Sequence, residues 1–167
     1  GTLEDSGAAG NDGVFHGGEP TFVEGYDGTP QGALAFDGID DMVELTYNDG
    51  LPITSHIFFS IAMWVKAPTG QADRRVFSES STVDNRPLFN IGTHNRGQGP
   101  QVDIYLRSDT GVQVLNHPKS QGSAFDDTWH HIAWVDAFGE ATLYIDGVRD
   151  PTNFSYRRPQ WTFTSTT

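Results

Sequence analysis

The feature that most constrains the fold is a period-two alternation of apolar side chains in short segments, of which 57–66 is the strongest example. Such alternation is typical of β-strands, in which successive side chains point to opposite faces. Because this segment is largely apolar on both faces, we expect a central strand of a sandwich, covered on each side. One face would hold Phe59, Ile61, Met63 and Val65, and the other Phe58, Ser60, Ala62, Trp64 and Lys66.

Further segments predict more strands and the turns between them. Segment 102–107 alternates apolar and polar residues, as half-buried strands do. A hairpin is predicted from 129–136 to 140–146 through the turn 137–139, and Asp146-Gly147 marks the next tight turn. Residues 1–31 read as ordered but irregular. The remaining strands are expected at 32–37, 42–45, 75–78, 87–91 and 112–115, and a last apolar stretch lies at 160–164.

Composition supports an all-β chain. The 167 residues suffice for one domain of ordinary size, and 19 Gly and 9 Pro supply frequent turns. No window of ten residues shows convincing helical periodicity. The absence of cysteine excludes disulfides, thiolate chemistry and Cys-ligated metal sites. We therefore predict a single all-β domain over residues 1–167, built as an antiparallel two-sheet sandwich.

The charge is acidic and unevenly distributed. Lys and Arg total 10 against 22 Asp and Glu, a formal net charge of −12, and residues 1–50 hold 11 acids but no Lys or Arg. This balance disfavours binding to nucleic acid or to an anionic membrane surface, because both need clustered cations. No apolar run approaches the roughly 18–20 residues that span a bilayer. An acidic surface suits solubility or the binding of divalent cations.

Four segments together resemble the laminin-G-like branch of the concanavalin A-like lectin/glucanase superfamily: 32–44 (GALAFDGIDDMVE), 59–66 (FSIAMWVK), 129–135 (WHHIAWV) and 141–147 (ATLYIDG). Residues 5–13 (DSGAAGNDG) are similar to a segment near the start of that family, so the resemblance covers roughly residues 5–150. It implies an extracellular jelly roll, often calcium-bearing, that serves in carbohydrate binding or adhesion to a cell-surface or matrix protein.

The usual terminal strands of the family are not recognised in this sequence. The family typically opens with a Trp-containing strand and closes with one of the Ile-Asp-Glu-Val-Arg type. We expect either a fragment of a longer protein, or a domain whose end strands are replaced by other segments, a neighbouring chain or another domain that completes the sheet.

Acidic loops offer ligands for calcium, which takes six to eight oxygens, typically from carboxylates and backbone carbonyls. The resemblance raises the expectation of a structural Ca²⁺. The alternative is that these are ordinary turn residues, since Asp, Asn and Gly dominate turns. The candidate ligands are Asp5, Asn11 and Asp12 in the first loop, and Asp37, Asp40 and Asp41 in the second.

Sugar binding calls for aromatic faces beside fixed polar groups. Arg86, Asn95 and Tyr105 are preferred because flat or forked polar groups suit hydroxyl recognition, and Arg107 joins them. The alternative is an ordinary solvated β surface. Further polar candidates are Asp84, Asn85, His94 and Arg96, whereas Trp64, Trp129 and Trp134 are expected in the core.

Catalysis is not expected. Retaining glycosidases need two carboxylates about 5–5.5 Å apart, and the glucanase pattern Glu-x-Asp-x-x-Glu is absent. Asp41 and Glu44 would lie on opposite faces of a regular strand. Adjacent His130 and His131 would likewise point to opposite faces. The leading hypothesis is a non-catalytic extracellular carbohydrate-binding or adhesion module. The alternatives are a building block of a surface layer, filament or adhesin and, less favoured, a glycoside hydrolase.

Overall fold

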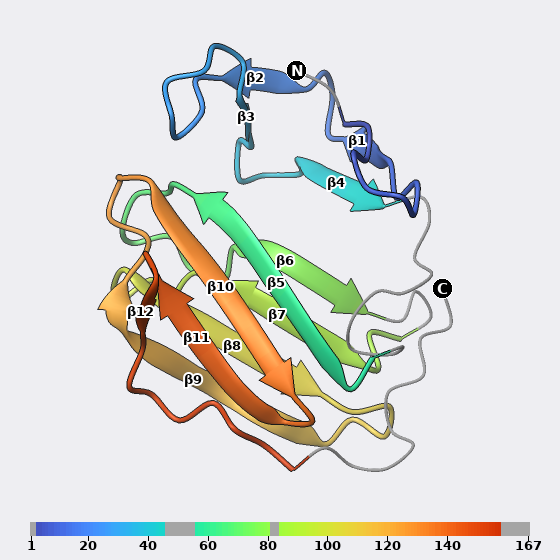
Figure 1. Ribbon diagram of the computed structural model, residues 1–167, viewed down its shortest axis with the longest axis vertical. Helices are drawn as coiled ribbons and strands as arrows, with labels where there is room; N and C mark the ends of the chain where they lie inside the picture. The colour runs from blue at the N-terminus through green and yellow to red at the C-terminus, as the bar shows by residue number, and fades with distance from the viewer. Residues whose placement is uncertain (1–2, 46–55, 81–83, 158–167) are drawn as a thin grey trace. The chain divides into compact units, whose positions relative to one another are not determined.

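The structure, a computed structural model, describes residues 3–45, 56–80 and 84–157, and the chain forms two compact units, 1–49 and 50–167 (Figure 1). Every regular element in the described ranges is a β-strand, which confirms the predicted all-β class. None of these residues belongs to a helix that could cross a membrane. The prediction of one domain over 1–167 stays a prediction.

Unit 50–167 contains two four-stranded antiparallel sheets, which confirm the predicted two-sheet jelly-roll sandwich (Figure 1). The first sheet has the order β12-β11-β10-β5, and the second has the order β6-β7-β8-β9. In the first, β5 spans Phe58–Val65, β10 His130–Ala137, β11 Glu140–Ile145 and β12 Val148–Arg149. In the second, β6 spans Arg75–Ser80, β7 Leu88–Gly92, β8 Gln101–Arg107 and β9 Gln113–Ser123.

The predicted hairpin is formed by β10 and β11, which are joined by a two-residue turn. Phe138 and Gly139 have φ of 58° and 90°, the positive values that a type I′ hairpin turn requires. Buried Asp136 holds the turn, because its Oδ1 accepts a hydrogen bond from the Gly139 N–H (2.8 Å) and its Oδ2 accepts one from the Tyr156 hydroxyl (2.6 Å). Asp146-Gly147 makes the next turn, between β11 and β12, as predicted.

The core lies between these two sheets and is built from the inward positions of the alternating strands. Phe89 of β7 lies 5.7 Å from Trp134 of β10 and 6.3 Å from Phe59 of β5, measured between ring centroids. Phe154, after β12, also contacts Trp134, with ring centroids 5.6 Å apart. Aromatic rings at such separations prefer tilted or edge-to-face packing, which these pairs adopt. The prediction that Trp134 is a core residue is thereby confirmed.

The prediction that segment 57–66 forms a central strand covered on both faces is wrong for the described residues. β5 is hydrogen-bonded to β10 alone and forms the edge of its sheet. Its inward face packs on the core, while Phe58 is 66% exposed and Trp64 is 42% exposed. Trp64 therefore is not a core residue; it packs edge-on against His131, whose ring centroid lies 5.3 Å away. Trp129 is partly buried.

Strand β9 is longer than the sequence predicts and changes the polar surface beside it. The prediction placed a strand at 112–115, whereas β9 continues to Ser123 through Pro118. Its pairing with β8 is irregular, with register shifts between Gln101 and Asp103 and again between Asp103 and Tyr105. Such bulges let a strand tolerate proline and redirect side chains. They bring residues 116–119 alongside the start of β8.

Unit 1–49 consists of two antiparallel strand pairs. β1 (Gly13–His16) pairs with β4 (Met42–Leu45), and β2 (Thr21–Val23) pairs with β3 (Ala33–Ala35). The prediction of an irregular segment over 1–31 is thus wrong at β1 and β2. These strands have only three or four residues, too few for a periodic pattern, and they form because later segments supply their hydrogen-bond partners. The apolar stretch predicted at 160–164 and Trp161 lie outside the described residues.

Candidate functional site

The outer face of the β6–β9 sheet is polar, because side chains on β8 alternate between apolar and polar residues. Val102, Ile104 and Leu106 point into the core and are fully buried. The alternate residues therefore point outward, and they are Asp103, Tyr105 and Arg107. On the neighbouring strand, the amide of Asn90 lies 2.8 Å from the Ser78 hydroxyl oxygen. The sheet that forms half of the core thus carries hydrogen-bonding groups on its other side.

Asp103 is the centre of a hydrogen-bonded cluster, although it is only 5% exposed. Its Oδ1 lies 2.7 Å from Nδ1 of His117, and its Oδ2 lies 3.3 Å from Nζ of Lys119. The backbone N–H of Asn95 also donates to Oδ2, at 3.3 Å. A buried carboxylate is tolerated when such partners compensate for its lost hydration. Because a carboxylate oxygen only accepts, Nδ1 of His117 carries a proton.

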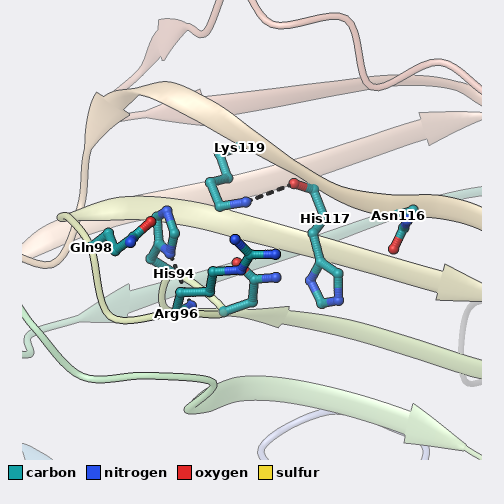
Figure 2. Close-up of a pocket in the computed structure, with 7 residues that line it drawn as sticks. His94, Arg96, Gln98, Asn116, His117 and Lys119 are labelled. Atoms are coloured by element: carbon teal, nitrogen blue, oxygen red, sulfur yellow. Dashed lines mark hydrogen bonds between the residues drawn. The ribbon is translucent and has the colours of Figure 1, made fainter.

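The irregular pairing of β8 and β9 produces this cluster. Lys119 lies directly opposite Asp103 in the register. His117 adopts a positive φ of 59°, the left-handed conformation that a bulge provides and that histidine visits more readily than most residues. Both side chains therefore reach the same carboxylate from one strand. Nζ of Lys119 also donates to the carbonyl oxygen of His117 (3.0 Å), which fixes the bulge (Figure 2).

A surface depression of about 350 Å³ adjoins this cluster (Figure 2). One wall comes from the loop between β7 and β8, and the other comes from β9. Asp103 lies behind the lining and is bonded to three of its members. The lining residues are His94, Asn95, Arg96, Gln98, Asn116, His117 and Lys119.

Two side chains of the loop between β7 and β8, His94 and Asn95, have hydrogen-bonding properties that affect ligand binding. Nδ1 of His94 accepts a hydrogen bond from the Arg96 N–H at 3.0 Å. Burial lowers the pKa of His94, and the positive charge of nearby Lys119 lowers it further. Oδ1 of Asn95 is buried and has no hydrogen-bond partner in the described part of the chain. An unpaired buried acceptor costs free energy, which a donor from a ligand or from water would recover.

An aromatic surface continues from the depression along β8. The Tyr105 ring lies beside the His117 ring, with centroids 4.8 Å apart and planes inclined by 32°. The Tyr105 hydroxyl accepts a hydrogen bond from Nε2 of Gln113 at 3.3 Å. The guanidinium carbon of Arg107 lies 6.0 Å from the centroid of the Tyr105 ring. Tyr105 thus joins the depression to a second cationic group.

The four residues predicted to bind sugar fall into two groups. Asn95 lines the depression and Tyr105 adjoins it through His117. Arg107 lies at the other end of β8, about 13 Å along the strand from Asp103, where its Nη2 donates to the Asn85 carbonyl oxygen. Arg86 is exposed in the same loop. The four side chains therefore do not converge on one point.

Sequence reasoning missed the contribution of β9. It named His94 and Arg96 but passed over Asn116, His117 and Lys119 because the predicted strand ended at 115. Proline is rare inside a strand except at the edge of a sheet, where β9 lies. The signal that could have found these residues is the His-Pro-Lys sequence directly after the predicted strand, since edge strands tolerate proline and often carry cations.

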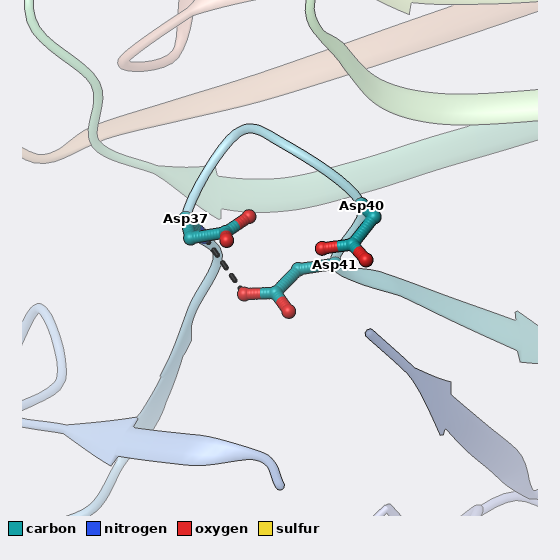
Figure 3. Close-up of side chains that lie close together, drawn as sticks. All are labelled: Asp37, Asp40 and Asp41. Atoms are coloured by element: carbon teal, nitrogen blue, oxygen red, sulfur yellow. Dashed lines mark hydrogen bonds between the residues drawn. The ribbon is translucent and has the colours of Figure 1, made fainter. Parts of the chain in front are cut away.

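The six predicted calcium ligands are also divided. Carboxylate oxygens of Asp37, Asp40 and Asp41 all lie within 4.8 Å of one another (Figure 3). Within this turn, the Asp37 N–H donates to Oδ2 of Asp41 (2.8 Å) and the Ile39 N–H donates to Oδ1 of Asp37 (2.7 Å). This group combines oxygens from the second predicted loop, on the segment between β3 and β4.

Asp5, Asn11 and Asp12 form a closed turn of their own. Asp5 accepts hydrogen bonds from the backbone N–H groups of Gly7 (2.7 Å) and Asn11 (2.9 Å), and these two bonds lower the pKa of its carboxyl. Asp12 in turn accepts a bond from the Asp5 N–H at 2.8 Å. In this first loop the Asp5 carboxylate and Oδ1 of Asp12 accept hydrogen bonds from the loop's own backbone.

His130 and His131 point to opposite faces of β10, as predicted. His131 contacts Trp64, whereas His130 lies between Asp146 (Nδ1 to Oδ2, 2.7 Å) and Asp126 (Nε2 to Oδ1, 3.0 Å). Burial by itself lowers the pKa of His130, but the bonds to Asp146 and Asp126 outweigh it, and the pKa is raised. This cluster ties the Asp146-Gly147 turn to the segment that precedes β10.

The comparison with protein families agrees with this architecture. The family model Laminin_G_3, described as the concanavalin A-like lectin/glucanases superfamily, matches residues 37–167. The chain belongs to this superfamily. The laminin-G match begins at Asp37, so residues 5–36 lie outside it, and it continues past residue 150, where the resemblance was expected to end. Searches of curated proteins and of solved structures find no match to this laminin-G-like chain.

Proposed function

We propose that this laminin-G-like protein is a non-catalytic extracellular module that binds carbohydrate, and so mediates adhesion, through the outer face of its β6–β9 sheet. The observation that carries the proposal is the depression beside Asp103, where amide, imidazole and cationic side chains lie next to the Tyr105 ring. Lectin-like function at the level of the superfamily agrees with this assignment.

The groups around the depression suit the chemistry of a saccharide. Sugars present hydroxyl groups, which donate and accept hydrogen bonds, and apolar C–H faces. Asn95, Gln98 and Asn116 provide amides for the hydroxyls, and the buried Oδ1 of Asn95 needs a donor. The Tyr105 ring provides a flat apolar surface at the rim. Ligand sites typically combine such an apolar surface with a few fixed polar groups.

The charges at the depression favour binding over hydrolysis. Among the described residues at this place, Asp103 provides the carboxylate, and both of its oxygens are already bonded. A glycosidase requires two carboxyl groups flanking the scissile bond, one of which gives or takes a proton. A carboxylate held between His117 and Lys119 is suited to positioning those two side chains, and this supports a non-catalytic role.

The turn with Asp37, Asp40 and Asp41 is our proposed site for a structural Ca²⁺. Calcium is bound by oxygen ligands in flexible loops, and three carboxylates with oxygens within 4.8 Å fit part of such a shell. The carbonyl oxygen of Asp40 and Oδ1 of Asp41 both approach Gly17, so a side chain there would crowd the turn. A bound ion would offset the mutual repulsion of these acids. The melting temperature should then rise with Ca²⁺ and fall with EDTA, and the triple change of these acids to Asn should abolish the difference.

The carbohydrate proposal is tested by a glycan array probed in Ca²⁺ and in EDTA. Asn95→Ala and Tyr105→Ala should each weaken binding by about tenfold, a typical effect of one good hydrogen bond or one aromatic contact. Matched controls are Asn153→Ala and Tyr144→Ala, which alter an exposed amide and a tyrosine outside the depression. Absence of binding in both conditions would rule out the carbohydrate function.

A second candidate function is that of a building block in a surface layer, filament or adhesin. The observation that favours it is the eight-residue edge strand β5, which is paired on one side only in the described structure. An open strand edge can accept a strand from a neighbouring chain. Size-exclusion chromatography with light scattering should then detect oligomers that grow with concentration. A monomer at every concentration would exclude this alternative.

A further inference from the structure

The lining of the depression is positively charged, whereas the molecule as a whole is negatively charged. The chain has a net charge of −12 and only 10 Lys and Arg, yet the seven lining residues include Arg96, Lys119, His94 and His117 and no acid. The other three are amides. Asp103, behind the lining, provides one negative charge. With both histidines neutral, the sum over Arg96, Lys119 and Asp103 is +1, and protonation of the two imidazoles adds to it.

The lining likewise has more hydrogen-bond donors than acceptors. Nζ of Lys119 has three donors and uses two, one to Asp103 and one to the His117 carbonyl. The Arg96 guanidinium has five N–H donors and forms no ion pair with another described residue. Nδ1 is engaged in both imidazoles, so in the neutral rings Nε2 of His94 is a donor and Nε2 of His117 is an acceptor. The site thus offers many more donors than acceptors.

We infer that the ligand of this depression is an anionic saccharide, bearing carboxylate or sulfate groups. The inference rests on the carbohydrate-binding function proposed above and specifies its substrate class. A neutral sugar hydroxyl needs an acceptor for its proton as well as a donor, whereas a carboxylate or sulfate only accepts. Arg96 and Lys119 would bind the anionic group through charge-assisted hydrogen bonds, which are about twice as strong as neutral ones. Tyr105 would contact the adjoining sugar ring.

The electrostatics around His94 agree with a positive local potential. Burial is the main cause that lowers the pKa of His94. The charge of Lys119 lowers it further, Asp103 raises it, and Arg96 and His117 add smaller lowering contributions. An anion in the depression would reverse part of this effect. Away from the depression, the negative charge of the chain repels polyanions, so weak non-specific binding does not account for a specific signal.

The experiment is calorimetric titration of the full chain with four probes. These are an oligogalacturonate, a sulfated galactan oligosaccharide, a neutral galactan oligosaccharide of the same length, and sodium sulfate. We expect at least one charged oligosaccharide to bind ten times more tightly than the neutral one, and this preference to shrink as NaCl screens the charges. The variant Arg96→Gln should reduce the preference at least tenfold, while the control Arg149→Gln, an exposed arginine on the other sheet, should leave it unchanged. Both variants keep the buried cluster intact, and a thermal melt checks that they are folded.

Each outcome separates the two proposals. Equal affinity for charged and neutral oligosaccharides, with Arg96→Gln indistinguishable from the parent, would overturn the anionic class but leave the carbohydrate function in place. Failure of every oligosaccharide to bind would overturn both proposals. Sodium sulfate binding as tightly as the sulfated oligosaccharide would show a site for a free anion, and would overturn the saccharide part of the inference.

Discussion

The two sheets of unit 50–167 share one core but differ on their outer faces. The β6–β9 sheet presents Asn90, Tyr105 and the Asp103 cluster, with hydrogen bonds across strands. The outer face of the β12-β11-β10-β5 sheet mixes apolar and polar side chains, including exposed Phe58, the Ala62–Ala133 pair and Trp64 packed against His131. Inward positions are constrained alike in both sheets because they fill the same interior. The outer faces are free to differ, and the depression lined by His117 and Lys119 lies on the β6–β9 side.

The largest expected effect on stability comes from a substitution in the core that the two sheets share. Phe89→Ala should destabilise the protein by about 3–5 kcal/mol, because Phe89 is fully buried and contacts Phe59, Phe77 and Trp134. Urea unfolding measures the loss. Both outer faces should lose their structure together, so the variant should also lose ligand binding at denaturant concentrations that the parent tolerates. A loss below about 1 kcal/mol would show that the interior is not close-packed.

The next effect concerns the buried acid of the polar face. Asp103→Asn should lower the free energy of unfolding by about 2–3 kcal/mol. This is no more than the low end of the about 3–5 kcal/mol that is usual for breaking a buried ion pair, because Lys119 and His117 are partly open to water. The new amide N–H₂ group would face donors in place of an acceptor. The matched control is Asp73→Asn, whose partner Arg75 is exposed, with an expected loss below about 0.5 kcal/mol. Equal losses in both variants would contradict a special role for Asp103.

A smaller effect is expected from His130 and His94, whose contributions to the free energy of unfolding should change with pH in opposite directions. His130, between two carboxylates, has a raised pKa, so its contribution to stability is fully present below the unfolded value near 6.5 and is lost as pH rises through the folded pKa. His94, beside the depression, has a lowered pKa, so its contribution is present above 6.5 and is lost as pH falls below it.

The test is urea unfolding of the parent, His130→Gln and His94→Gln between pH 5 and 8.5. The stability advantage of the parent over His130→Gln should shrink with rising pH, and its advantage over His94→Gln should shrink with falling pH. Asp126 and Asp146 have pKa values lowered by their bonds to Thr128 and His130, respectively, so they stay ionised across this range. Parallel curves for the two variants would refute the contrast.

The smallest effect on stability is expected from a substitution on the outer face of the β12-β11-β10-β5 sheet. Phe58→Ser should change the free energy of unfolding by less than about 0.5 kcal/mol, because the side chain is largely exposed. It should leave ligand binding unchanged. If the edge strand mediates assembly, the same substitution should reduce oligomerisation in light scattering. A large loss of stability without oligomers would show that Phe58 packs against a part of the protein.

Most of the sandwich could be predicted because alternation and turn chemistry are local. Asp146-Gly147 and the Phe138-Gly139 turn follow from residues that adopt positive φ, and the inward faces of β8, β10 and β11 follow from period-two patterns. The candidate site was predicted only in part. Asn95 and Tyr105 were named from their chemistry, but His117 and Lys119 lie on a bulged strand whose irregular register interrupts the pattern. The position of β5 at a sheet edge does not follow from local sequence.

The sequence by itself determined the all-β class, the hairpin turns and the apolar interior, since each depends on neighbours within a few residues. Only the tertiary structure decided which polar residues meet. Asp103 and Lys119 are sixteen positions apart along the chain and join because β8 and β9 pair with shifted register. The lining of the depression contains cationic side chains and no acid, which a net charge of −12 conceals. Net charge sums over the whole chain, whereas recognition depends on the few side chains that folding gathers in one place.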